Sequence, residues 1–292
     1  MSLAPGKAPP LAFGGDCNAV VTDAEIDRLA GADLSRMPDE SNGSASPIEV
    51  LGGITCVWNG GDYAFSVAIT VIPAAGHEDR IAAEFSYPAG LQCWGQDEDG
   101  VGGACYFGRI VAGYWLGGLV TDESETGLRP TESIDAIAAL VEQRASEYPA
   151  TPVELPTGTW QATDCATVAA GMADEMSIDL PAVDSAMTSA GYLGPGPVGA
   201  AAIVGGARCV WSAPPGFTTD LTPGAGWALA RLTEATPIEV DGVTAAMLRE
   251  QADGSARIFA TDGVNFAWIT VPESSSPAQA AAFLAVVMRA AS

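Results

Sequence analysis

The six cysteines are the residues whose type and number most directly suggest chemistry. They stand at Cys17, Cys56, Cys93, Cys105, Cys165 and Cys209. No pair has the Cys-x-x-Cys spacing of a redox motif, and the chain has a single histidine, so zinc ligation is disfavoured. An even number of cysteines without such spacing predicts disulfide bonds, which are typical of exported proteins. Six free thiols in a cytosolic protein are the less favoured alternative.

A short motif around four of these cysteines occurs twice. Asp16-Cys17 is followed further along the chain by Cys56-Val57-Trp58, and Asp164-Cys165 is followed in the same way by Cys209-Val210-Trp211. A frame of this kind that occurs twice indicates two diverged copies of one domain.

The repeat also predicts how the cysteines pair. Pairing within each copy joins Cys17 to Cys56 and Cys165 to Cys209. The remaining two, Cys93 and Cys105, are then expected to close a loop that only the first copy has. Each of the two longer closed loops should stabilise the fold by about 3–4 kcal/mol, because the crosslink restricts the unfolded chain.

Each copy continues with the same predicted order of elements. A strand is expected at 64–72 in the first copy and at 226–233 in the second. A hairpin follows, with Ala112-Gly113 as its turn in the first copy and Asp262-Gly263 in the second. The flanking strands are expected at 109–111, 114–121, 257–261 and 264–271. Each copy ends in an amphipathic helix, and the two apolar stripes comprise Ile134, Ile137, Leu140 and Val141, and Phe283, Leu284, Val287 and Met288.

The beginnings of the helices and the loops have signals of their own. Thr22 or Asp23 is expected to cap the first helix of the first copy, and Asp164 that of the second. The stretches 41–53 and 191–206 are rich in Gly and Pro and are expected to be loops.

The predicted fold class is therefore α+β, with two tandem homologous domains. Each domain is expected to be an antiparallel sheet packed by its N- and C-terminal helices. We assign residues 1–12 to a spacer, 13–148 to the first domain, 149–159 to a Pro-rich linker and 160–292 to the second domain. The spacer is expected to follow a leader that lies outside this sequence.

The repeated frame resembles a large family of small secreted actinobacterial lipoproteins of unknown function. The resemblance covers 16–74, with Val21-Thr22-Asp23-Ala24-Glu25 as the helix start, and in the second copy only Asp164-Cys165 and Cys209-Val210-Trp211. It implies a helix–sheet fold, a disulfide between the first helix and the first strand, and a cell-envelope location. It implies no activity, because the family offers no catalytic residues to carry over.

The charge balance argues against two classes of partner. The chain has 36 acidic and 12 basic residues, a formal net charge of −24. Nucleic acids and anionic membrane surfaces are bound by clusters of Lys and Arg, so neither is expected here. No apolar run approaches the length of a membrane span, so a membrane is expected only through an N-terminal lipid anchor outside this sequence. The partner classes that remain are an unidentified envelope protein and a small ligand.

Three motifs could carry catalytic, nucleotide or metal chemistry, and each has a simpler interpretation that we favour. His77 could act as a base beside Glu78 or Asp79, but no nucleophile lies nearby in the sequence. Gly194-Pro195-Gly196-Pro197-Val198-Gly199 has the letters of a dinucleotide-binding loop but follows no strand, so it is predicted to be a flexible loop. Asp97-Glu98-Asp99-Gly100 lacks the ligand spacing of a calcium loop. We expect no metal and no cofactor.

The aromatic residues of the first copy are the most suggestive feature for function. Trp94, Tyr106 and Trp115 belong to its hairpin and to the loop that the Cys93–Cys105 disulfide is expected to close, which we call the stapled loop. These three residues form the candidate binding surface. If the two turns are aligned, Trp115 matches the polar Asn265. Trp115 then either packs beneath the stapled loop, which is favoured, or belongs to the exposed surface.

The favoured function is a non-catalytic exported cell-envelope protein that binds a partner protein, a peptide or an apolar ligand. Enzymatic activity stays open, and a carboxylate-based hydrolase is the alternative because so acidic a chain offers many carboxylates. A structural or sensor ectodomain is a third hypothesis.

Overall fold

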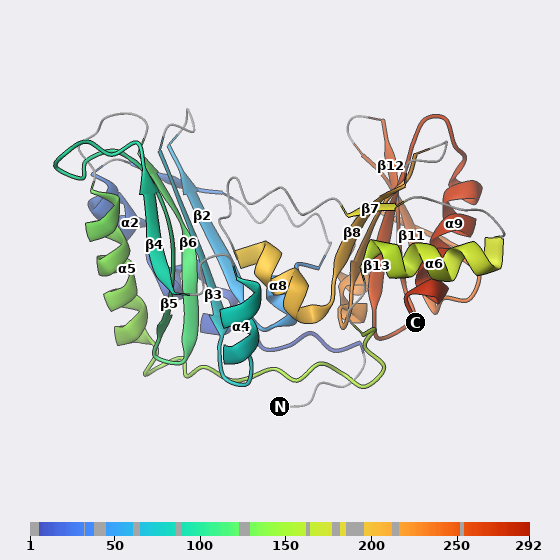
Figure 1. Cartoon of the computed structure of the whole chain (residues 1–292), viewed down its shortest axis with the longest axis horizontal. Helices are drawn as coiled ribbons and strands as arrows, with labels where there is room; N and C mark the ends of the chain where they lie inside the picture. The colour runs from blue at the N-terminus through green and yellow to red at the C-terminus, as the bar shows by residue number, and fades with distance from the viewer. Residues whose placement is uncertain are drawn as a thin grey trace.

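The computed structural model shows two antiparallel sheets with helices packed against each of them (Figure 1). The residues that it describes are 6–31, 33–37, 45–60, 65–85, 89–122, 129–161, 164–176, 182–184, 196–211, 216–251 and 254–292. The predicted α+β fold class is confirmed.

The first sheet is formed by the N-terminal half of the chain. Its described strands are β1 (Ser35–Arg36), β2 (Ile54–Asn59), β3 (Phe65–Pro73), β4 (Gly90–Trp94), β5 (Gly103–Val111) and β6 (Tyr114–Asp122). Their order is β1-β2-β3-β6-β5-β4, and all neighbours are antiparallel.

The second sheet is formed by the C-terminal half. Its described strands are β7 (Ala182–Asp184), β8 (Ala207–Trp211), β9 (Thr218–Thr222), β10 (Thr236–Ile238), β11 (Ala245–Glu250), β12 (Ala256–Thr261) and β13 (Phe266–Val271). Their order is β10-β11-β12-β13-β9-β8-β7, again antiparallel throughout.

The two sheets share one topology. If the strands are counted from the one that carries Cys-Val-Trp, the order in the first sheet is β2-β3-β6-β5-β4, and the order in the second sheet is β8-β9-β13-β12-β11. Each strand of one copy therefore has a counterpart in the other, and β10 is an additional edge strand. The structure thus shows two similar sheet domains, as the repeated sequence frame predicts.

Each sheet buries its outer face beneath the helices that begin and end its copy. These are η1 (Ala12–Gly15), α1 (Cys17–Val20), α2 (Asp23–Ala30) and α5 (Pro130–Arg144) in the first copy, and α6 (Cys165–Met176) and α9 (Pro277–Ala290) in the second. Thr22 caps α2 through a capping box with Glu25, and Asp164 accepts the backbone N–H of Thr167 at 2.6 Å where α6 begins. These predicted caps are confirmed.

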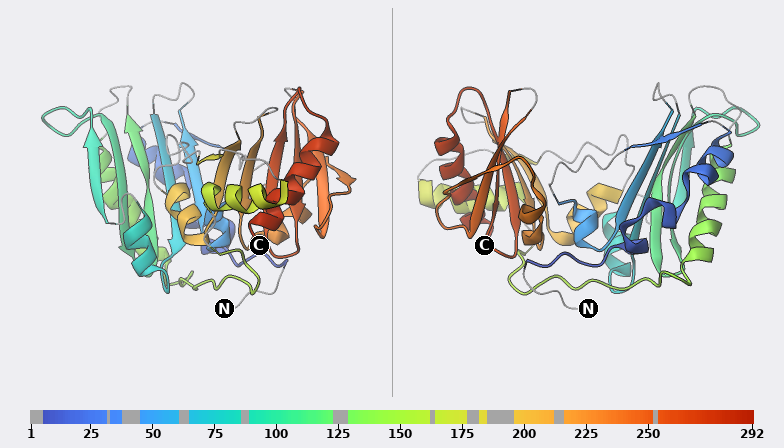
Figure 2. Two further views of the ribbon diagram at one scale, coloured as in Figure 1. Left: turned by 45° about the vertical axis from the view of Figure 1, so that its right-hand side comes forward. Right: turned by 180° about the vertical axis from the view of Figure 1, so that it is seen from behind.

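The inner faces of the sheets are turned toward each other, with four short elements between them. These are α3 (Pro47–Val50), α4 (Glu78–Glu84), α8 (Gly196–Val204) and η2 (Gly226–Arg231). The α8 helix contacts both α3 and α4 and so joins the second copy to the first (Figures 1 and 2). A shared hydrophobic core, which we call the interdomain core, includes Ile72 and Trp115 from the first sheet and Phe259, Phe266 and Trp268 from the second.

Polar contacts across this interface are reciprocal. In each copy one helical element follows the second strand of the shared order: α4 follows β3, and η2 follows β9. Arg80 of α4 donates to the backbone carbonyls of Ala202 and Ile203 in α8. Arg231 of η2 donates to the Glu49 carboxylate of α3 at 2.7 Å. Each copy thus presents an arginine to the helix that precedes the cysteine strand of the other copy.

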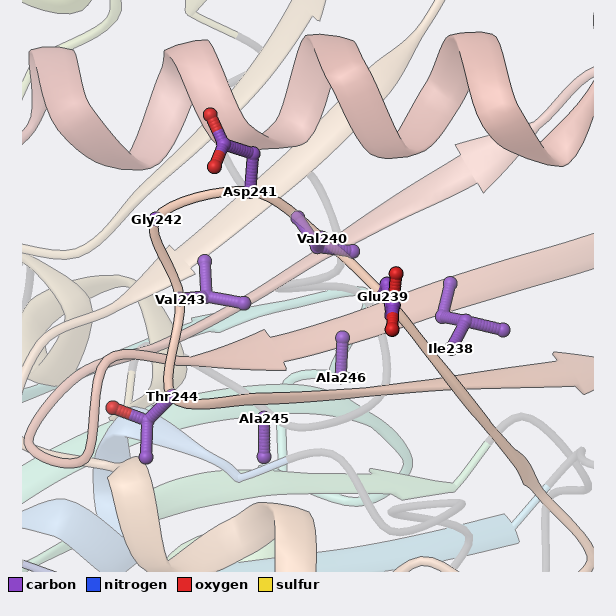
Figure 3. A pocket seen from close by; sticks show the side chains of 9 residues that line it. All are labelled: Ile238, Glu239, Val240, Asp241, Gly242, Val243, Thr244, Ala245 and Ala246. Atoms are coloured by element: carbon purple, nitrogen blue, oxygen red, sulfur yellow. The ribbon is translucent and has the colours of Figure 1, made fainter.

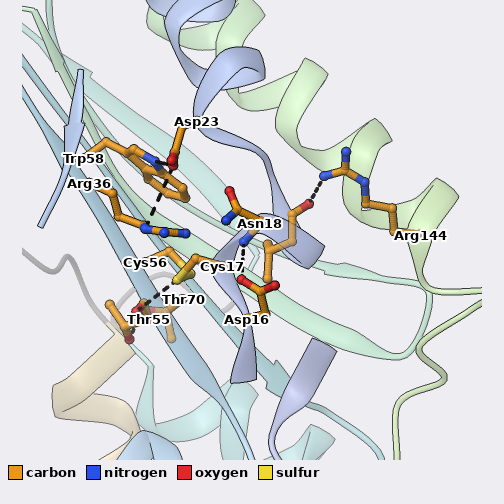
Figure 4. The surroundings of a disulfide bond; sticks show 11 residues. Asp16, Cys17, Asn18, Asp23, Arg36, Thr55, Cys56, Trp58, Thr70 and Arg144 are labelled. Carbon is orange, nitrogen blue, oxygen red and sulfur yellow. Dashed lines mark hydrogen bonds and ion pairs between the residues drawn. A yellow bond between two sulfur atoms is a disulfide. The ribbon is translucent and has the colours of Figure 1, made fainter. Parts of the chain in front are cut away.

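All three predicted disulfides are present: Cys17–Cys56, Cys93–Cys105 and Cys165–Cys209. The first joins α1 to β2, beside the buried Trp58, whose indole N–H donates to Asp23 at 2.8 Å (Figure 4). Three disulfides are typical of a protein that folds in an oxidising, extracellular compartment.

The predicted strand at 226–233 is wrong. Gly226–Arg231 forms η2, and the strand of the second copy that pairs with the cysteine strand is β9. Trp227, Ala228 and Leu229 of η2 are all buried in the interdomain core. A short continuous apolar run is ambiguous between a buried strand and a buried helical segment, and here the contacts between the domains decide.

The predicted two-residue turn of the second hairpin is also wrong. Phe266 pairs with Thr261, so residues 262–265 form the turn. The Asp262 carboxylate accepts two backbone N–H groups within it, which stabilises the wider turn. The first-copy turn at Ala112-Gly113 has the predicted two residues.

Each of the two Gly- and Pro-rich stretches contains a helix where a loop was expected. Pro47–Val50 forms α3 and Gly196–Val204 forms α8. Both helices have a proline in the first turn, where its missing N–H removes no intrahelical hydrogen bond. The glycine motif at 194–199 is therefore partly helical, and its first two residues lie outside the described residues.

Residues 149–161 connect the half of the chain that forms the first sheet to the half that forms the second. They contain no helix, and Glu154 forms an isolated bridge. Val153 and Trp160 are buried, so this segment packs against its surroundings along part of its length. The assignment of 149–159 as a linker stays a prediction.

No helix among the described residues is both long and apolar enough to cross a membrane.

Candidate functional site

Two of the three predicted aromatic residues lie together on the inner face of the first sheet. Trp94 of β4 pairs with Ala104, and Tyr106 of β5 pairs with Gln92, so both aromatic side chains project from the same face. Their ring centroids are 5.0 Å apart. Trp94 is 46% exposed, although burial of its indole would be favourable. We call Trp94 and Tyr106 the aromatic pair.

A disulfide holds the aromatic pair in place. Cys93 and Cys105 are direct cross-strand partners, and each is the chain neighbour of one aromatic residue. The bond fixes the edge strand β4 to β5 at this position. A preorganised aromatic surface loses little conformational entropy when a ligand binds.

A hollow of about 630 Å³ opens beside Trp94 at the end of the same hairpin. Its lining residues are Trp94, Gly95, Asp97, Val101, Gly102, Gly103, Ala104 and Asp122. The Asp97 carboxylate accepts the backbone N–H groups of Asp99 and Val101 at 2.9 and 2.8 Å, so it closes its own turn. Gly103 has a φ of 73°, and a Cβ there would collide with the Trp94 carbonyl.

Apolar side chains extend the surface across the sheet. Tyr106 and Val57 pack on a small cluster of Ala68, Ala104 and Leu119. This cluster is separate from the interdomain core and from the core beneath the outer helices. Around the aromatic pair, the inner face of the first sheet thus combines apolar and aromatic side chains with the polar Gln92, Thr121 and Ser66, which belong to the same cross-strand rows.

The third predicted residue, Trp115, is not brought to the aromatic pair. It is 0% exposed and packs edge-on against Phe85 within the interdomain core, with ring centroids 4.3 Å apart. It lies neither beneath the stapled loop nor on a surface, because α4 and α8 cover this part of the inner face.

The predicted match of Trp115 to Asn265 is wrong as well. The cysteine strands set the alignment of β3 with β9, in which Ile72 corresponds to Thr222. Ile72 pairs with Trp115 and Thr222 pairs with Phe266, so Trp115 and Phe266 are equivalent. Both are buried aromatic residues, and the wider second turn accounts for the shift.

A charged cluster that was not predicted from the sequence lies on the inner face of the second sheet. Arg208, Asp220 and Trp268 are direct partners in one cross-strand row. The guanidinium carbons of Arg208 and Arg257 lie 5.5 and 4.7 Å from the Trp268 ring centroid. No sequence motif marks this cluster, and the strand register alone brings its members together.

Asp220 has a strongly perturbed carboxyl group. Burial raises its pKa to about 6, and this effect outweighs the opposing charge of Arg208, a hydrogen bond from Thr222 and the charge of Arg257. Asp220 therefore changes its charge near neutral pH, within reach of two arginines.

The remaining candidate from the sequence, His77, contacts the protein backbone. His77 precedes α4, and its Nε2 lies 3.3 Å from the Val153 carbonyl oxygen.

A second hollow, of about 580 Å³, is lined by residues 238–246 (Figure 3). All of its lining residues belong to one continuous segment, so it is the interior of the β10–β11 connection. Within the described ranges, no three His, Cys, Asp or Glu side chains gather closely enough to hold a metal ion.

No protein-family model, curated protein or solved structure matches this chain.

Proposed function

We propose that the protein is an exported, non-catalytic binding protein that holds an apolar or aromatic group of a peptide or small ligand on the aromatic pair. One observation carries this proposal. Trp94 is 46% exposed, yet its ring packs at a tilt against Tyr106, and the neighbouring disulfide holds the two strands together. An exposed tryptophan on a rigid strand pair gains free energy when a partner covers it.

The surroundings of the pair support a binding site. The hollow beside Trp94 offers room for part of a ligand, and Gly95, Gly102 and Gly103 are among its lining residues. The three disulfides support export. The resemblance of the Asp-Cys and Cys-Val-Trp frame to small envelope lipoproteins favours the cell envelope as the destination.

A neutral fluorescent probe tests the surface directly. Nile red should bind the wild-type protein saturably with enhanced emission, and Trp94→Ala or Tyr106→Ala should weaken that binding about tenfold or more. Leu91→Ala is the matched control, because Leu91 lies on the same strand, is 43% exposed and projects from the opposite face. Equal probe binding by wild type and Trp94→Ala would refute the proposed surface.

A peptide selection then addresses the natural ligand class. Peptides selected on wild-type protein and counter-selected on Trp94→Ala should share an aromatic or aliphatic anchor residue. Selection of the same peptides by both proteins would place binding elsewhere on the chain.

A further inference from the structure

The two sheets differ at one edge. In the second sheet β10 lies beside β11, and Thr236 is the cross-strand partner of Leu248. Leu91 of β4 corresponds to Leu248, because the two residues end the cross-strand rows that begin at Cys56 and Cys209. Among the described residues of the first copy, no strand lies beyond β4, and α4 precedes β4 where η2 and β10 precede β11. Within the described part of the chain, the first sheet thus lacks the strand that completes the second.

The edge at β4 is also the least protected against pairing with another chain. The other edge strands, β1, β7 and β10, have two, three and three residues, and β1 contains Arg36 while β10 contains Pro237. β4 has five residues, Gly90–Trp94, without a charged residue or a proline. Short length, charge and proline are usual means by which proteins prevent an edge strand from pairing. β4 has none of them.

The backbone of β4 directs hydrogen-bonding groups toward the open edge. In an antiparallel pair, directly opposed residues alternate between bonded pairs with Cα atoms about 5.5 Å apart and non-bonded pairs with Cα atoms about 4.5 Å apart. The Cα atoms of Cys93 and Cys105 are 4.1 Å apart, so these residues form a non-bonded pair. The N–H and C=O groups of Cys93 therefore point away from β5, and by the same alternation so do those of Leu91.

Exposed apolar side chains flank these backbone groups on both faces of the sheet. Leu91 projects from the outer face and Trp94 from the inner face, and both are exposed. In the second copy, the corresponding Leu248 packs against the domain core, as does Ile238 of β10. An added strand with an apolar side chain on each face would cover Leu91 and Trp94 in the same way.

The charge around the edge favours one kind of occupant. Asp97, Glu98 and Asp99 follow β4 and are exposed, and residues 81–108 include no Lys, Arg or His. A second copy of this chain, with its own net charge of −24, would be repelled, whereas a basic peptide would be attracted. An antiparallel strand places its N-terminal end beside the C-terminal end of β4. Basic residues are therefore expected at the N-terminal end of the peptide.

We propose that β4 is a docking edge for an extended peptide segment of a partner protein, which adds to the first sheet as an antiparallel strand. The segment hydrogen-bonds to the backbone of Leu91 and Cys93, presents an apolar side chain to Trp94, and has basic residues at its N-terminal end. This inference deepens the proposed function and rests on it for the contact with Trp94. It adds that pairing with the backbone of β4 contributes the affinity.

A phage-displayed library of random peptides tests the edge with the whole chain. Peptides of about nine residues, long enough to span β4, are selected on wild-type protein and synthesised with a fluorescent label for anisotropy measurements. Each backbone nitrogen of an enriched peptide is then methylated in turn. Methylation should weaken binding about tenfold or more at alternate positions only, because an antiparallel strand directs every second N–H to its neighbour.

A proline at the edge tests the same hydrogen bonds from the side of the protein. Leu91→Pro removes an outward N–H and leaves the bonds to β5 in place, so it should weaken peptide binding about tenfold or more. Leu91→Val is the matched control, because it keeps the N–H and an apolar side chain, and it should bind within about twofold of wild type.

Hydrogen exchange gives a readout that needs no variant. Bound peptide should slow exchange at the N–H groups of Leu91 and Cys93, because these groups then lie within the sheet. This measurement, with the methylated peptides, decides the question if Leu91→Pro does not fold.

The outcomes separate strand addition from the proposed function. Failure to enrich any peptide, tolerance of methylation at every position, or equal peptide binding by wild type and folded Leu91→Pro would each overturn strand addition. Nile red binding that still depends on Trp94 would then leave the aromatic pair standing alone. Conversely, Nile red binding that is unaffected by Trp94→Ala, with the alternating pattern intact, would refute the aromatic pair and keep the strand pairing. A dimer of the free chain that Leu91→Pro dissociates would assign the edge to a second copy and overturn the peptide partner.

Discussion

Trp115 of the first sheet and Phe85 at the end of α4 meet edge to face, with ring centroids 4.3 Å apart and ring planes inclined by 60°. Both side chains are buried in the interdomain core, together with α8 and the inner face of the second sheet. The contact therefore belongs to the packing of one domain on the other. It also separates Trp115 from the exposed Trp94 of the same sheet.

Replacing Trp115 by Ala should lower the free energy of unfolding by about 3–5 kcal/mol, because a large buried ring is removed and the cavity relaxes only partly. Trp94→Ala should cost less than about 1 kcal/mol, because half of that indole is already in water. Urea unfolding of both variants measures the difference. Similar losses for the two would contradict the assignment of one to the core and the other to a surface.

The close approach of α8 to the first domain depends on a glycine. A Cβ at Gly199 would collide with the Phe85 ring, so Gly199→Val should force α8 away from α4. We expect a larger radius of gyration by small-angle scattering and a lower midpoint of thermal unfolding. Ala202→Val is the matched control, since Ala202 is on the same helix and is only partly buried. An unchanged radius with unchanged stability would show that the interface tolerates the added side chain.

Asn265 joins the second hairpin to the chain that enters the domain. Its Oδ1 accepts the backbone N–H groups of Trp160 and Gly224, each at 3.1 Å, and its Nδ2 donates to the Gly158 carbonyl at 3.0 Å. Asn265→Ala leaves these groups without partners in a buried site, so we expect a loss of about 3 kcal/mol or more on urea unfolding. Asn18→Ala, at a helix start with a backbone contact only, should stay within about 0.5 kcal/mol of wild type.

The raised pKa of Asp220 makes stability depend on pH. Its pKa is 3.8 in the unfolded reference and about 6 in the folded chain, so the folded state holds the proton more tightly. The stability linked to this group is present below about pH 4 and is lost as pH rises through about 6. Asp220→Asn should therefore match wild type near pH 4 and exceed it by up to about 3 kcal/mol near pH 8. Urea midpoints at both pH values measure this, and a variant less stable than wild type at pH 8 would refute it.

Removing the Cys93–Cys105 disulfide should loosen the aromatic pair without abolishing the fold. The bond closes a short segment, with a sequence separation of 12, so Cys93→Ser with Cys105→Ser should cost about 2–3 kcal/mol. Nile red affinity should fall as well, because the edge strand loses its attachment beside Trp94. Intact mass after alkylation supplies the control: the wild type should take up alkyl groups only after reduction. A variant with full stability and full probe affinity would remove the disulfide from the binding argument.

Local patterns in the chain are enough to predict the disulfides, the two copies and the outer helices. Asp-Cys followed by Cys-Val-Trp is a short motif that can be read without knowing the fold, and its repetition fixes the pairing of Cys17 with Cys56. Thr22 with Glu25 is a local capping signal, and the stripe of α9 follows the helical period. These features depend on residues close in sequence or on a short motif that occurs twice.

The positions of the aromatic and charged side chains depend on the tertiary structure instead. Whether Trp115 is buried depends on α8, which comes from the other domain, and α8 itself lies in a stretch whose Gly and Pro content predicts a loop. Arg208 and Trp268 are far apart in the chain and meet only because β8, β9 and β13 pair in one register. Strand register and domain packing are determined by the burial of whole sheet faces, which involves residues far apart in the chain. A shift of one residue in a turn is enough to exchange the two faces of a strand.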